Sequence, residues 1–177
     1  MLNKPNVFLI GPMGSGKSAV GRQLARMLGL PFHDSDAEIE RRTGVDIAYI
    51  FEKEGEAGFR QREHEAIDVL TAMPGVVLAT GGGAVLLPDN RRLLATRGCV
   101  VYLETSVTQQ ADRVRQGRSR PLLADADPEA KLQELMAVRA PLYEEIADIR
   151  VCTDHRRVRG VAEGILRELE SRTGHAS

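Results

Sequence analysis

The segment that points most directly to chemistry is residues 11–18, which read Gly-Pro-Met-Gly-Ser-Gly-Lys-Ser. This order fits the phosphate-loop pattern G-x-x-x-x-G-K-S/T without a gap. Glycine lets a backbone approach a ligand closely, and successive N–H groups in such a turn form a nest that binds anions. We therefore expect Lys17 to reach the β- and γ-phosphates of a nucleotide and the Ser18 hydroxyl to contact Mg²⁺. The alternative is a glycine-rich turn that binds nothing, but the motif lies between an apolar run and a helical pattern, as a phosphate loop requires.

Two acids, Asp34 and Asp36, flank Ser35 after a weaker apolar run at 30–33. One acid can simply be the N-cap of a helix, because an acidic helical segment follows. Capping needs only one such residue, however, and both acids lie at the expected carboxyl end of a strand. The pair therefore favours a role in binding a ligand or a metal, with capping as the alternative.

Three consecutive glycines, Gly81, Gly82 and Gly83, follow the apolar run 76–79. Such a run is costly in chain entropy and is typical of a backbone that closely approaches a ligand, although a plain turn needs only one or two glycines. No acid follows this run, so the Asp of a Walker-B strand is absent there. Glu104 follows the later apolar run 100–103 as a Walker-B acid would, so it is a candidate metal ligand. The alternative is that Glu104 simply ends a strand.

Two arginines lie where helical patterns place them beside apolar residues. Arg60 is at the edge of an apolar stripe with Glu63 one turn later, and this spacing alone favours a solvated surface pair. Arg139 falls inside another stripe, where the helical period calls for an apolar residue. Pro141 should break or kink that helix near Ala140. An arginine at this point either extends outward to solvent or turns inward to meet an anion.

The segment 112–127 is polar and rich in arginine, including Arg118 and Arg120. No apolar periodicity ties this segment to a core. Its composition is typical of a mobile loop that brings cations onto a phosphate, and a solvated surface loop is the alternative.

Regular elements must position all of these groups. Short apolar runs, typical of buried strands, alternate with amphipathic helical patterns, which predicts a parallel α/β sheet covered by helices on both faces. The predicted strands are 7–10, a weaker one at 30–33, 76–79, 100–103 and 149–152. The predicted helices include 17–28, one opened by Asp127-Pro128 and one that ends near Arg172. Ligands of such sheets bind at the carboxyl ends of the strands, where the phosphate loop, the two acids and the glycines all lie.

Composition narrows the class of protein. The chain has 177 residues, enough for one domain with a buried core, and its 24 Lys and Arg balance 25 Asp and Glu. A net charge of −1 gives no reason to expect a nucleic-acid or anionic-membrane partner. The apolar runs are far shorter than the roughly 20 residues of a membrane helix, and we expect neither a signal peptide nor a membrane anchor. Cys99 and Cys152 are predicted to be buried free thiols, and we expect a cytoplasmic protein.

Together these motifs resemble those of shikimate kinases over most of the chain, from about Asn6 to Leu169. The phosphate loop is shared by many families, whereas the other motifs in this order are far more specific. The segments that carry the resemblance are residues 11–18, Asp34-Ser35-Asp36, Phe59-Arg60 with Glu63, Gly81-Gly82-Gly83, Arg120-Pro121-Leu122-Leu123 and Arg139-Ala140-Pro141-Leu142-Tyr143. The missing Walker-B Asp is itself similar to the family pattern.

The resemblance implies a fold and a domain plan. The fold would be the three-layer P-loop fold of nucleoside monophosphate kinases, an α/β fold with a five-stranded parallel sheet of order 2-3-1-4-5, helices on both faces and a mobile lid. One kinase domain would span residues 1–177, with the lid at about 113–127 and the acceptor-binding region at about 34–63. Members of this family are usually monomers that act in the pathway to chorismate and the aromatic amino acids.

The same resemblance implies roles for individual residues. ATP would contact the phosphate loop and three arginines, namely Gly14, Ser15, Gly16, Lys17, Ser18, Ala19, Arg113, Arg120 and Arg157. The acceptor would contact Asp36, Arg60, Glu63, Gly81, Gly82, Gly83 and Arg139, with the arginines facing the carboxylate of shikimate and Asp36 its hydroxyls. Mg²⁺ would be bound by Ser18 and, through water, by Asp34. The catalytic residues would be Lys17 and Arg120, which supply positive charge, and Asp36, which accepts the hydroxyl proton.

The reaction implied is in-line transfer of the γ-phosphoryl group of ATP to the 3-hydroxyl of shikimate. Another small-molecule kinase of the same fold, acting on a nucleoside monophosphate or a sugar acid, is an alternative, since paired arginines also suit a phosphate. A non-catalytic nucleotide-binding module is a third possibility, although such a module should have lost Lys17, Ser18 or Arg120. A GTPase switch would carry an N-K-x-D motif after a later strand, and the sequence has none there.

Overall fold

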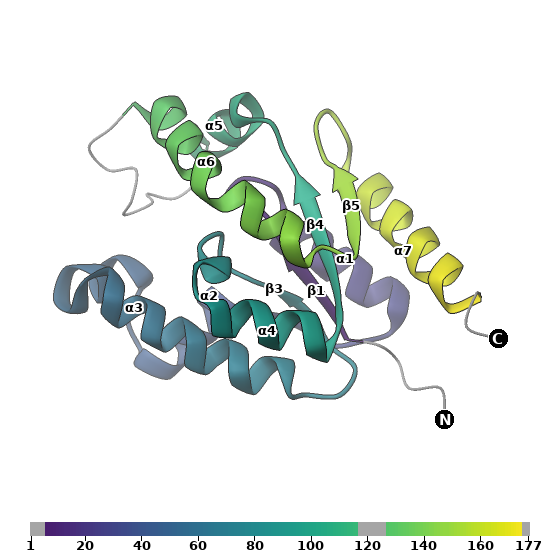
Figure 1. Ribbon diagram of the computed structural model, residues 1–177, viewed down its shortest axis with the longest axis horizontal. Helices are drawn as coiled ribbons and strands as arrows, with labels where there is room; N and C mark the ends of the chain where they lie inside the picture. Colours follow the sequence, from purple (N-terminus) through teal and green to yellow (C-terminus); the bar gives the residue numbers. More distant parts are fainter. Residues whose placement is uncertain (1–5, 117–126, 175–177) are drawn as a thin grey trace.

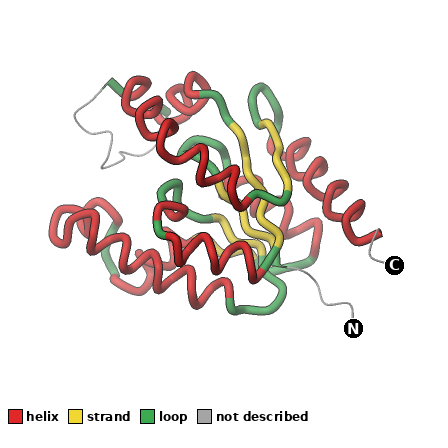
Figure 2. The backbone as a smooth tube through the Cα atoms, viewed as in Figure 1, coloured by secondary structure: helices red, strands yellow, loops and turns green. Residues whose placement is uncertain are grey.

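The computed structural model describes residues 6–116 and 127–174. In these ranges the elements are β1 (Val7–Ile10), α1 (Lys17–Leu28), β2 (Phe32–Asp34), α2 (Ser35–Thr43), α3 (Ile47–Thr71), β3 (Val77–Ala79), the 3₁₀ turn η1 (Ala84–Leu86), α4 (Pro88–Arg97), β4 (Cys99–Glu104), α5 (Val107–Arg115), α6 (Pro128–Ile146), β5 (Ile149–Cys152) and α7 (Val158–Gly174). The strands form one five-stranded sheet of order β2-β3-β1-β4-β5, and neighbouring strands are parallel. Helices cover both of its faces (Figure 1 and Figure 2). The predicted sheet and its strand order are confirmed.

The central strand β1 explains why the fold has three layers. All four of its side chains are fully buried, as expected for a parallel strand covered on both faces. Val7 and Leu9 pack in one core cluster with side chains of α1 and α7, whereas Phe8 and Ile10 pack in a second cluster with side chains of α3, α4 and α6. Burial of each such side chain contributes roughly 1.5–3 kcal/mol, so the two clusters hold both helical layers onto the sheet.

The register of the sheet brings the candidate residues to one edge. Leu9 of β1 and Asp34 of β2 both pair with Ala79 of β3, so the three strands end at the same level. The Thr80 N–H, directly after β3, donates to the Leu9 carbonyl at 3.1 Å. The phosphate loop, the acids of residues 34–36 and the glycines after β3 therefore start from neighbouring strand ends.

Helix α1 spans the residues predicted for it and is limited by glycine at both ends. Gly16 is its N-cap and Gly29 its C-cap, and both have left-handed φ angles of 87° and 65°. The N–H of Gly29 bonds to the carbonyls of the last turn, which ends the helix there.

Helix α3 is interrupted at Gly55, whose φ of 73° and ψ of −178° are not helical. Two helical segments therefore meet at an angle within α3. The interruption lets Arg62 reach back to Glu54, with Nε 2.9 Å from Oε2, a contact that a straight helix does not allow at a separation of eight residues.

Helix α6 continues through Pro141, so of the break or kink expected near Ala140 the break does not occur. A proline removes one backbone N–H from the helix, and the hydrogen bonds on either side remain. Tyr143, which follows the proline, is fully buried in the core cluster, and Leu132, before it, is buried against α5. Packing on both sides of the proline therefore keeps the helix in one piece.

Other expectations differ from the structure in detail. Strand β2 begins at Phe32 rather than at residue 30, and α7 extends to Gly174. The prediction of buried thiols is wrong, because Cys152 is exposed and Cys99 is half-buried, although both are free. Cys152 lies on the edge strand β5, where alternate side chains face outward. Within the described ranges, no helix combines the length and apolar character needed to cross a membrane.

Candidate active site

The phosphate loop, residues 11–18, leads from β1 into α1 and packs tightly against α5. Gly14 has a φ of 78°, which favours glycine, and a Cβ there would lie 3.0 Å from the backbone oxygen of Gln110 in α5. Gly16 caps α1 without a side-chain hydrogen bond. The first N–H groups of α1 and the positive end of its dipole thus suit an anion.

Lys17 turns back over the loop that precedes it. Its Nζ donates to the carbonyl oxygens of Gly11 at 2.7 Å and of Pro12 at 2.8 Å, and the residue is only 9% exposed. The ammonium group is therefore held over the loop rather than in solvent, at the position where it would meet the phosphates of a nucleotide.

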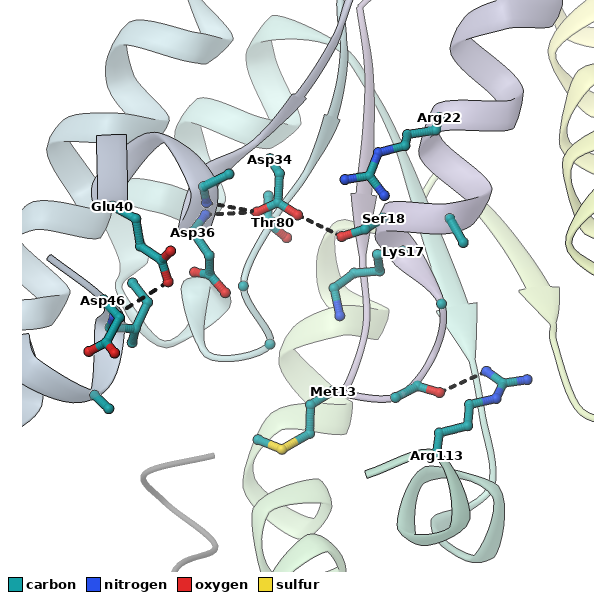
Figure 3. A pocket seen from close by; sticks show the side chains of 18 residues that line it. Met13, Lys17, Ser18, Arg22, Asp34, Asp36, Glu40, Asp46, Thr80 and Arg113 are labelled. Carbon is teal, nitrogen blue, oxygen red and sulfur yellow. Dashed lines mark hydrogen bonds between the residues drawn. The ribbon is translucent and has the colours of Figure 1, made fainter. Parts of the chain in front are cut away.

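The two oxygens of Asp34 have different partners (Figure 3). Oδ2 accepts a hydrogen bond of 2.6 Å from the Ser18 hydroxyl, whereas Oδ1 accepts from the N–H groups of Asp36 and Ala37. Asp34 is thus the N-cap of α2, as the capping alternative expected. The same carboxylate also joins α2 to the start of α1.

Arg60 pairs with a fully buried Glu63, and its own side chain is mostly buried, so the expectation of a solvated surface pair is wrong. Glu63 is fully buried, and its Oε1 accepts from Arg60 Nη1 at 2.8 Å. The other oxygen, Oε2, has no hydrogen-bond partner among the described residues. A Cβ on Gly81 would lie 2.7 Å from this oxygen and 3.0 Å from Asp36 Oδ1. Two carboxylates therefore approach the same glycine.

Residues 81–83, which we call the glycine turn, connect β3 to η1. None of the three glycines has a positive φ, so close packing rather than backbone conformation explains them. A Cβ on Gly82 would lie 3.3 Å from the Met13 N and 3.5 Å from Arg139 Nη1. A Cβ on Gly83 would overlap Arg60, with Cζ 2.6 Å away. The turn thus admits two guanidinium groups and the phosphate loop against its backbone.

Arg139 points inward from α6 and is only 4% exposed. Burial lowers the pKa of its guanidinium, and the nearby charge of Arg60 adds to that effect. Two positive groups from two different helices therefore lie close to each other beside the glycine turn. Of the two orientations considered for Arg139, the inward one is correct, and planar guanidinium groups in this arrangement suit a carboxylate or a phosphate.

A cavity of about 800 Å³ extends from the phosphate loop to Gly81 and Gly82 of the glycine turn. The predicted acceptor residues Arg60, Glu63, Gly83 and Arg139 do not line it. Figure 3 shows Lys17 and Ser18 in the first turn of α1, Asp36 in the first turn of α2 and Asp34 at the end of β2 pointing toward it, and Thr80 directly after β3 also lines it. Ten of the site residues predicted from the sequence line this cavity, namely Gly14, Gly16, Lys17, Ser18, Ala19, Asp34, Asp36, Gly81, Gly82 and Arg113. The volume is that of a small-molecule site, with anion-binding groups on one side and carboxylates on the other.

Comparison with known proteins identifies the family. The family model for shikimate kinase matches residues 13–170. The chain belongs to the shikimate kinase family. A shikimate kinase of Halorhodospira halophila is 59% identical over 93% of both chains, and one of Actinobacillus pleuropneumoniae serotype 5b is 53% identical over 97% of this chain and 99% of its own. The solved structure of a shikimate kinase from Acinetobacter baumannii in complex with shikimate has a TM-score of 0.93 and 49% identity, covering 95% of this chain and 94% of that one.

Not every residue predicted for a shikimate kinase site lines the cavity in this family member. Ser15 is buried within the loop, and Arg157 is exposed just before α7. Arg113 does line the cavity, and its Nη1 donates to the Gly14 carbonyl at 2.7 Å. Arg118 and Arg120, with most of the expected lid, lie outside the described residues. Glu104 ends β4 without lining the cavity, as its simpler interpretation expected.

Other residues line the cavity that the sequence patterns did not single out. Arg22 lies one turn after Ser18 on α1, so helical spacing from the phosphate loop could have found it. Thr80 follows β3 directly, so its position at the carboxyl end of a strand could have identified it as a site residue. Glu40 and Asp46 belong to α2 and the cap of α3, and only the packing of these two helices brings them to the cavity.

The buried Glu63 predicts that this shikimate kinase family member loses stability as the pH rises. Burial raises the pKa of Glu63 from 4.5 to about 7, the charge of Arg60 offsets part of this rise, and the charge of Asp36 adds to it. The pKa is thus higher in the folded than in the unfolded protein. The stability from Glu63 is therefore complete below about pH 4.5 and is lost as the pH rises through about 7.

We expect Glu63→Gln to remove this pH dependence, since the amide keeps an acceptor for Arg60 but does not ionise. Urea unfolding at pH 5 and pH 8 measures it, and the wild type should lose up to about 3 kcal/mol relative to the variant. Glu65→Gln on the exposed side of α3 is the matched control. Parallel stability profiles of wild type and Glu63→Gln would contradict the expectation.

Proposed function

We propose that the protein transfers the γ-phosphoryl group of ATP to the 3-hydroxyl of shikimate, giving shikimate 3-phosphate and ADP in the pathway to chorismate. The observation that carries this proposal is the pair of inward guanidinium groups, Arg60 and Arg139, packed against a glycine turn beside a phosphate loop. This arrangement offers a site for a carboxylate on a small ring next to the transferred phosphate. Membership of the shikimate kinase family supports the choice of shikimate as that ring.

The phosphate loop and its neighbours would bind the nucleotide. In our proposal the ATP-binding residues are Gly14, Ser15, Gly16, Lys17, Ser18, Ala19, Arg113, Arg120 and Arg157. The left-handed glycines and the uncapped start of α1 support phosphate binding here. Arg113 supports it further, because its bond to the Gly14 carbonyl puts a cation beside the loop. The assignments of Arg120 and Arg157 rest on the family resemblance.

The acceptor would bind on the other side of the cavity. In our proposal its contacts are Asp36, Arg60, Glu63, Gly81, Gly82, Gly83 and Arg139. The guanidinium groups would hold the carboxylate, and Glu63 would keep Arg60 in place through their buried ion pair. Asp36 would accept hydrogen bonds from the ring hydroxyls, a role supported by its position at the cavity near Gly81.

The oxygens at the start of α1 and α2 fit Mg²⁺. The Ser18 hydroxyl and an Asp34 carboxylate oxygen are 2.6 Å apart, and both are hard oxygen donors that this ion prefers. The described residues contain no group of three or more His, Cys, Asp or Glu side chains suited to a metal, but Mg²⁺ in kinases needs only one or two carboxylates with phosphate oxygens and waters. When bound, the ion would neutralise charge on the β- and γ-phosphates.

The chemical step follows from the positions of the protein groups. The acceptor hydroxyl oxygen would attack the γ-phosphorus in line, forming a P–O bond while the bond from phosphorus to the β–γ bridging oxygen breaks. Lys17 and Arg120 would stabilise the charge of the loose transition state. The hydroxyl proton would pass to Asp36. Positioning and charge neutralisation then account for catalysis.

The wider setting is also part of the proposal. One kinase domain would span residues 1–177, with a lid at 113–127 and an acceptor-binding region at 34–63. The protein would act as a cytoplasmic monomer without nucleic-acid or membrane partners. Its net charge of −1 supports the expectation that it has no nucleic-acid partner.

Acceptor specificity tests the proposal. Wild type should release ADP from ATP with shikimate, but bind poorly a shikimate analogue whose carboxylate is reduced to an alcohol. Arg139→Lys should weaken shikimate binding by about 1.5–3 kcal/mol and leave ATP affinity almost unchanged, because an ammonium lacks the fork of a guanidinium. Arg139→Lys should bind the alcohol analogue only slightly more weakly than wild type does. Preference for a nucleoside monophosphate or a sugar acid would refute the proposed acceptor, and loss of ATP affinity would place Arg139 at the nucleotide.

A further inference from the structure

We propose that Tyr143 is a positioning residue for the acceptor, which fixes the glycine turn relative to Arg139. The inference rests on the proposed function, because the turn and Arg139 belong to the acceptor site proposed above. Tyr143 does not line the cavity, so its effect on the acceptor would pass through the backbone of the turn.

The contact between Tyr143 and the turn is direct and buried. Tyr143 is fully buried on α6, and its hydroxyl donates to the Gly82 carbonyl at 2.5 Å. It lies one helical turn after Arg139, so both side chains project from the same face of α6. Arg139 Nη1 is 3.5 Å from where a Cβ on Gly82 would be. One helix therefore presents a hydroxyl and a guanidinium to the same glycine.

A bond at this carbonyl controls the part of the turn that has the most freedom. Glycine has more conformational freedom to lose than any other residue, and here three stand in a row. The peptide unit between Gly82 and Gly83 is planar and trans, so holding the Gly82 carbonyl also directs the N–H of Gly83 to the opposite side. Tyr143 thereby sets the orientation of this peptide unit with respect to Arg139.

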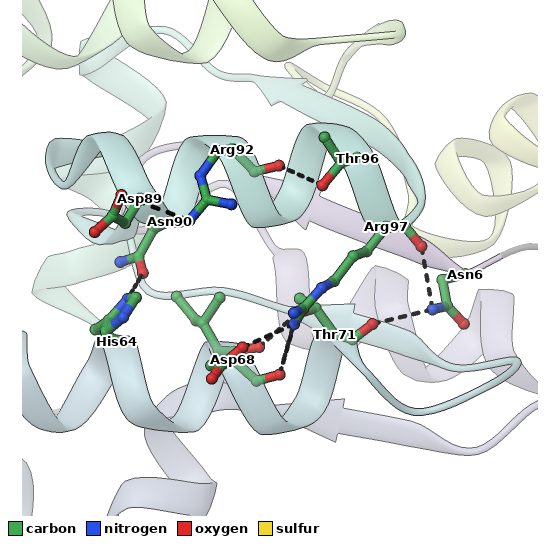
Figure 4. Close-up of polar contacts among 10 residues, drawn as sticks. Asn6, His64, Asp68, Thr71, Asp89, Asn90, Arg92, Thr96 and Arg97 are labelled. Atoms are coloured by element: carbon green, nitrogen blue, oxygen red, sulfur yellow. Dashed lines mark hydrogen bonds and ion pairs between the residues drawn. The ribbon is translucent and has the colours of Figure 1, made fainter.

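Side chains of α4 fix the 3₁₀ turn η1, which follows the glycine turn, by hydrogen bonds to its backbone carbonyls. Asn90 is fully buried, and its Nδ2 donates to the Ala84 carbonyl at 3.0 Å. The other end of its amide bonds to His64 Nδ1 at 2.7 Å, a contact that joins α3 to α4 (Figure 4). Arg91 Nη1 donates to the Val85 carbonyl at 2.7 Å. With η1 fixed from α4, the hydroxyl of Tyr143 holds the glycine turn between η1 and β3.

The ring and the hydroxyl of Tyr143 have separable roles. The ring packs beside that of Tyr102 in the core cluster, with centroids 5.0 Å apart. Phenylalanine would keep this packing and remove the hydroxyl, with its bond to Gly82 and its interaction with Arg139. Tyr102 is a matched control, since it is buried in the same cluster and its hydroxyl makes no hydrogen bond to the turn within the described residues.

The experiment compares Tyr143→Phe and Tyr102→Phe by steady-state kinetics with shikimate and ATP. We expect Tyr143→Phe to raise the KM for shikimate about three- to tenfold, the range for one lost hydrogen bond, and to leave the KM for ATP unchanged. Tyr102→Phe should change neither constant. A shikimate KM equal to that of wild type in Tyr143→Phe, or an equal rise in both KM values, would overturn the inference.

A second variant keeps the test independent of the folding of the first. Asn90→Leu removes the support at Ala84 with little change in volume, and it should also raise the KM for shikimate selectively. If Tyr143→Phe folds and shows no selective rise, or if it does not fold and Asn90→Leu shows none, the inference is overturned while the proposed function stands. Absence of shikimate phosphorylation in wild type would instead overturn the proposed function.

Discussion

Replacement of Lys17 by methionine should leave a folded protein whose phosphoryl transfer is slower by roughly 10²-fold or more. Its ammonium group is held over the phosphate loop by two carbonyl oxygens, at 2.7 and 2.8 Å. Methionine has similar length without the charge, so the transition state would lose a cation that acts on the β- and γ-phosphates. The measurement is kcat/KM from coupled ADP release, with the folded state checked by circular dichroism.

The control for this prediction is Lys53→Met. Lys53 is an exposed lysine of α3 that pairs loosely with Glu52 at 3.8 Å, so its loss should not change the rate. Near-normal turnover of Lys17→Met would contradict the kinase assignment. A comparable loss in both variants would instead mean that the assay reports general damage.

Asp36→Asn should lower kcat by about 10²- to 10⁴-fold, the usual contribution of a positioned base, at every Mg²⁺ concentration. The amide cannot take up the hydroxyl proton, and extra metal does not replace that function. Acceptor binding should weaken as well, because one oxygen acceptor of the carboxylate becomes a donor. The rate measured as a function of Mg²⁺ concentration, with shikimate varied, checks both effects.

Asp34→Asn is the matched variant two residues earlier. Asn caps a helix about as well as Asp, so the start of α2 should be retained. Mg²⁺ keeps several of its waters, so loss of one charge in its surroundings should raise the Mg²⁺ needed for half-maximal rate and be largely reversed at high Mg²⁺. Rescue of Asp36→Asn by Mg²⁺, without rescue of Asp34→Asn, would reverse the assignment of the two acids.

Local signals were enough to predict the sheet. Short apolar runs indicated five strands, and glycines on both sides of α1 limited that helix to the predicted residues. The family resemblance then supplied the strand order, which periodicity does not contain. The prediction that both cysteine thiols are buried was wrong, because an apolar strand pattern does not specify which side chains are buried at the edge of a sheet. Cys152 ends an apolar run yet faces outward, because Ile149 and Val151 face the core cluster that includes α7 and alternate side chains of a strand point to opposite faces.

The site was harder to predict because its contacts cross between distant elements. The spacing of Arg60 and Glu63 indicates that they are neighbours on a helix but not whether that face is buried. Glu63 is buried because its carboxylate lies against Gly81 and α3 packs against α2 and α4, which sequence spacing does not reveal. Arg139 was recognisable as an anomaly in its apolar stripe, but its inward direction depends on the glycine turn opposite.

The periodicity of α6 gave no signal for the hydroxyl of Tyr143, and the family motif that contains this residue assigned it no role. An apolar stripe explains the ring fully, so nothing in the sequence distinguishes this tyrosine from phenylalanine. The three glycines indicated that a ligand closely approaches their backbone, which stays a prediction. The structure adds that the approaching groups include the side chains of Arg60, Glu63 and Arg139.

The packing at Gly83 has a consequence for how the family can diverge. Its φ of −95° is open to any residue, and the three atoms nearest to an added Cβ among the described residues all belong to the guanidinium of Arg60. That group ends a long side chain, so a methyl group at position 83 would displace it without disturbing the backbone. Glycine at 83 is therefore needed for as long as arginine stands at 60. We expect the two positions to vary together in evolution, and lineages that accept a different substrate to change both.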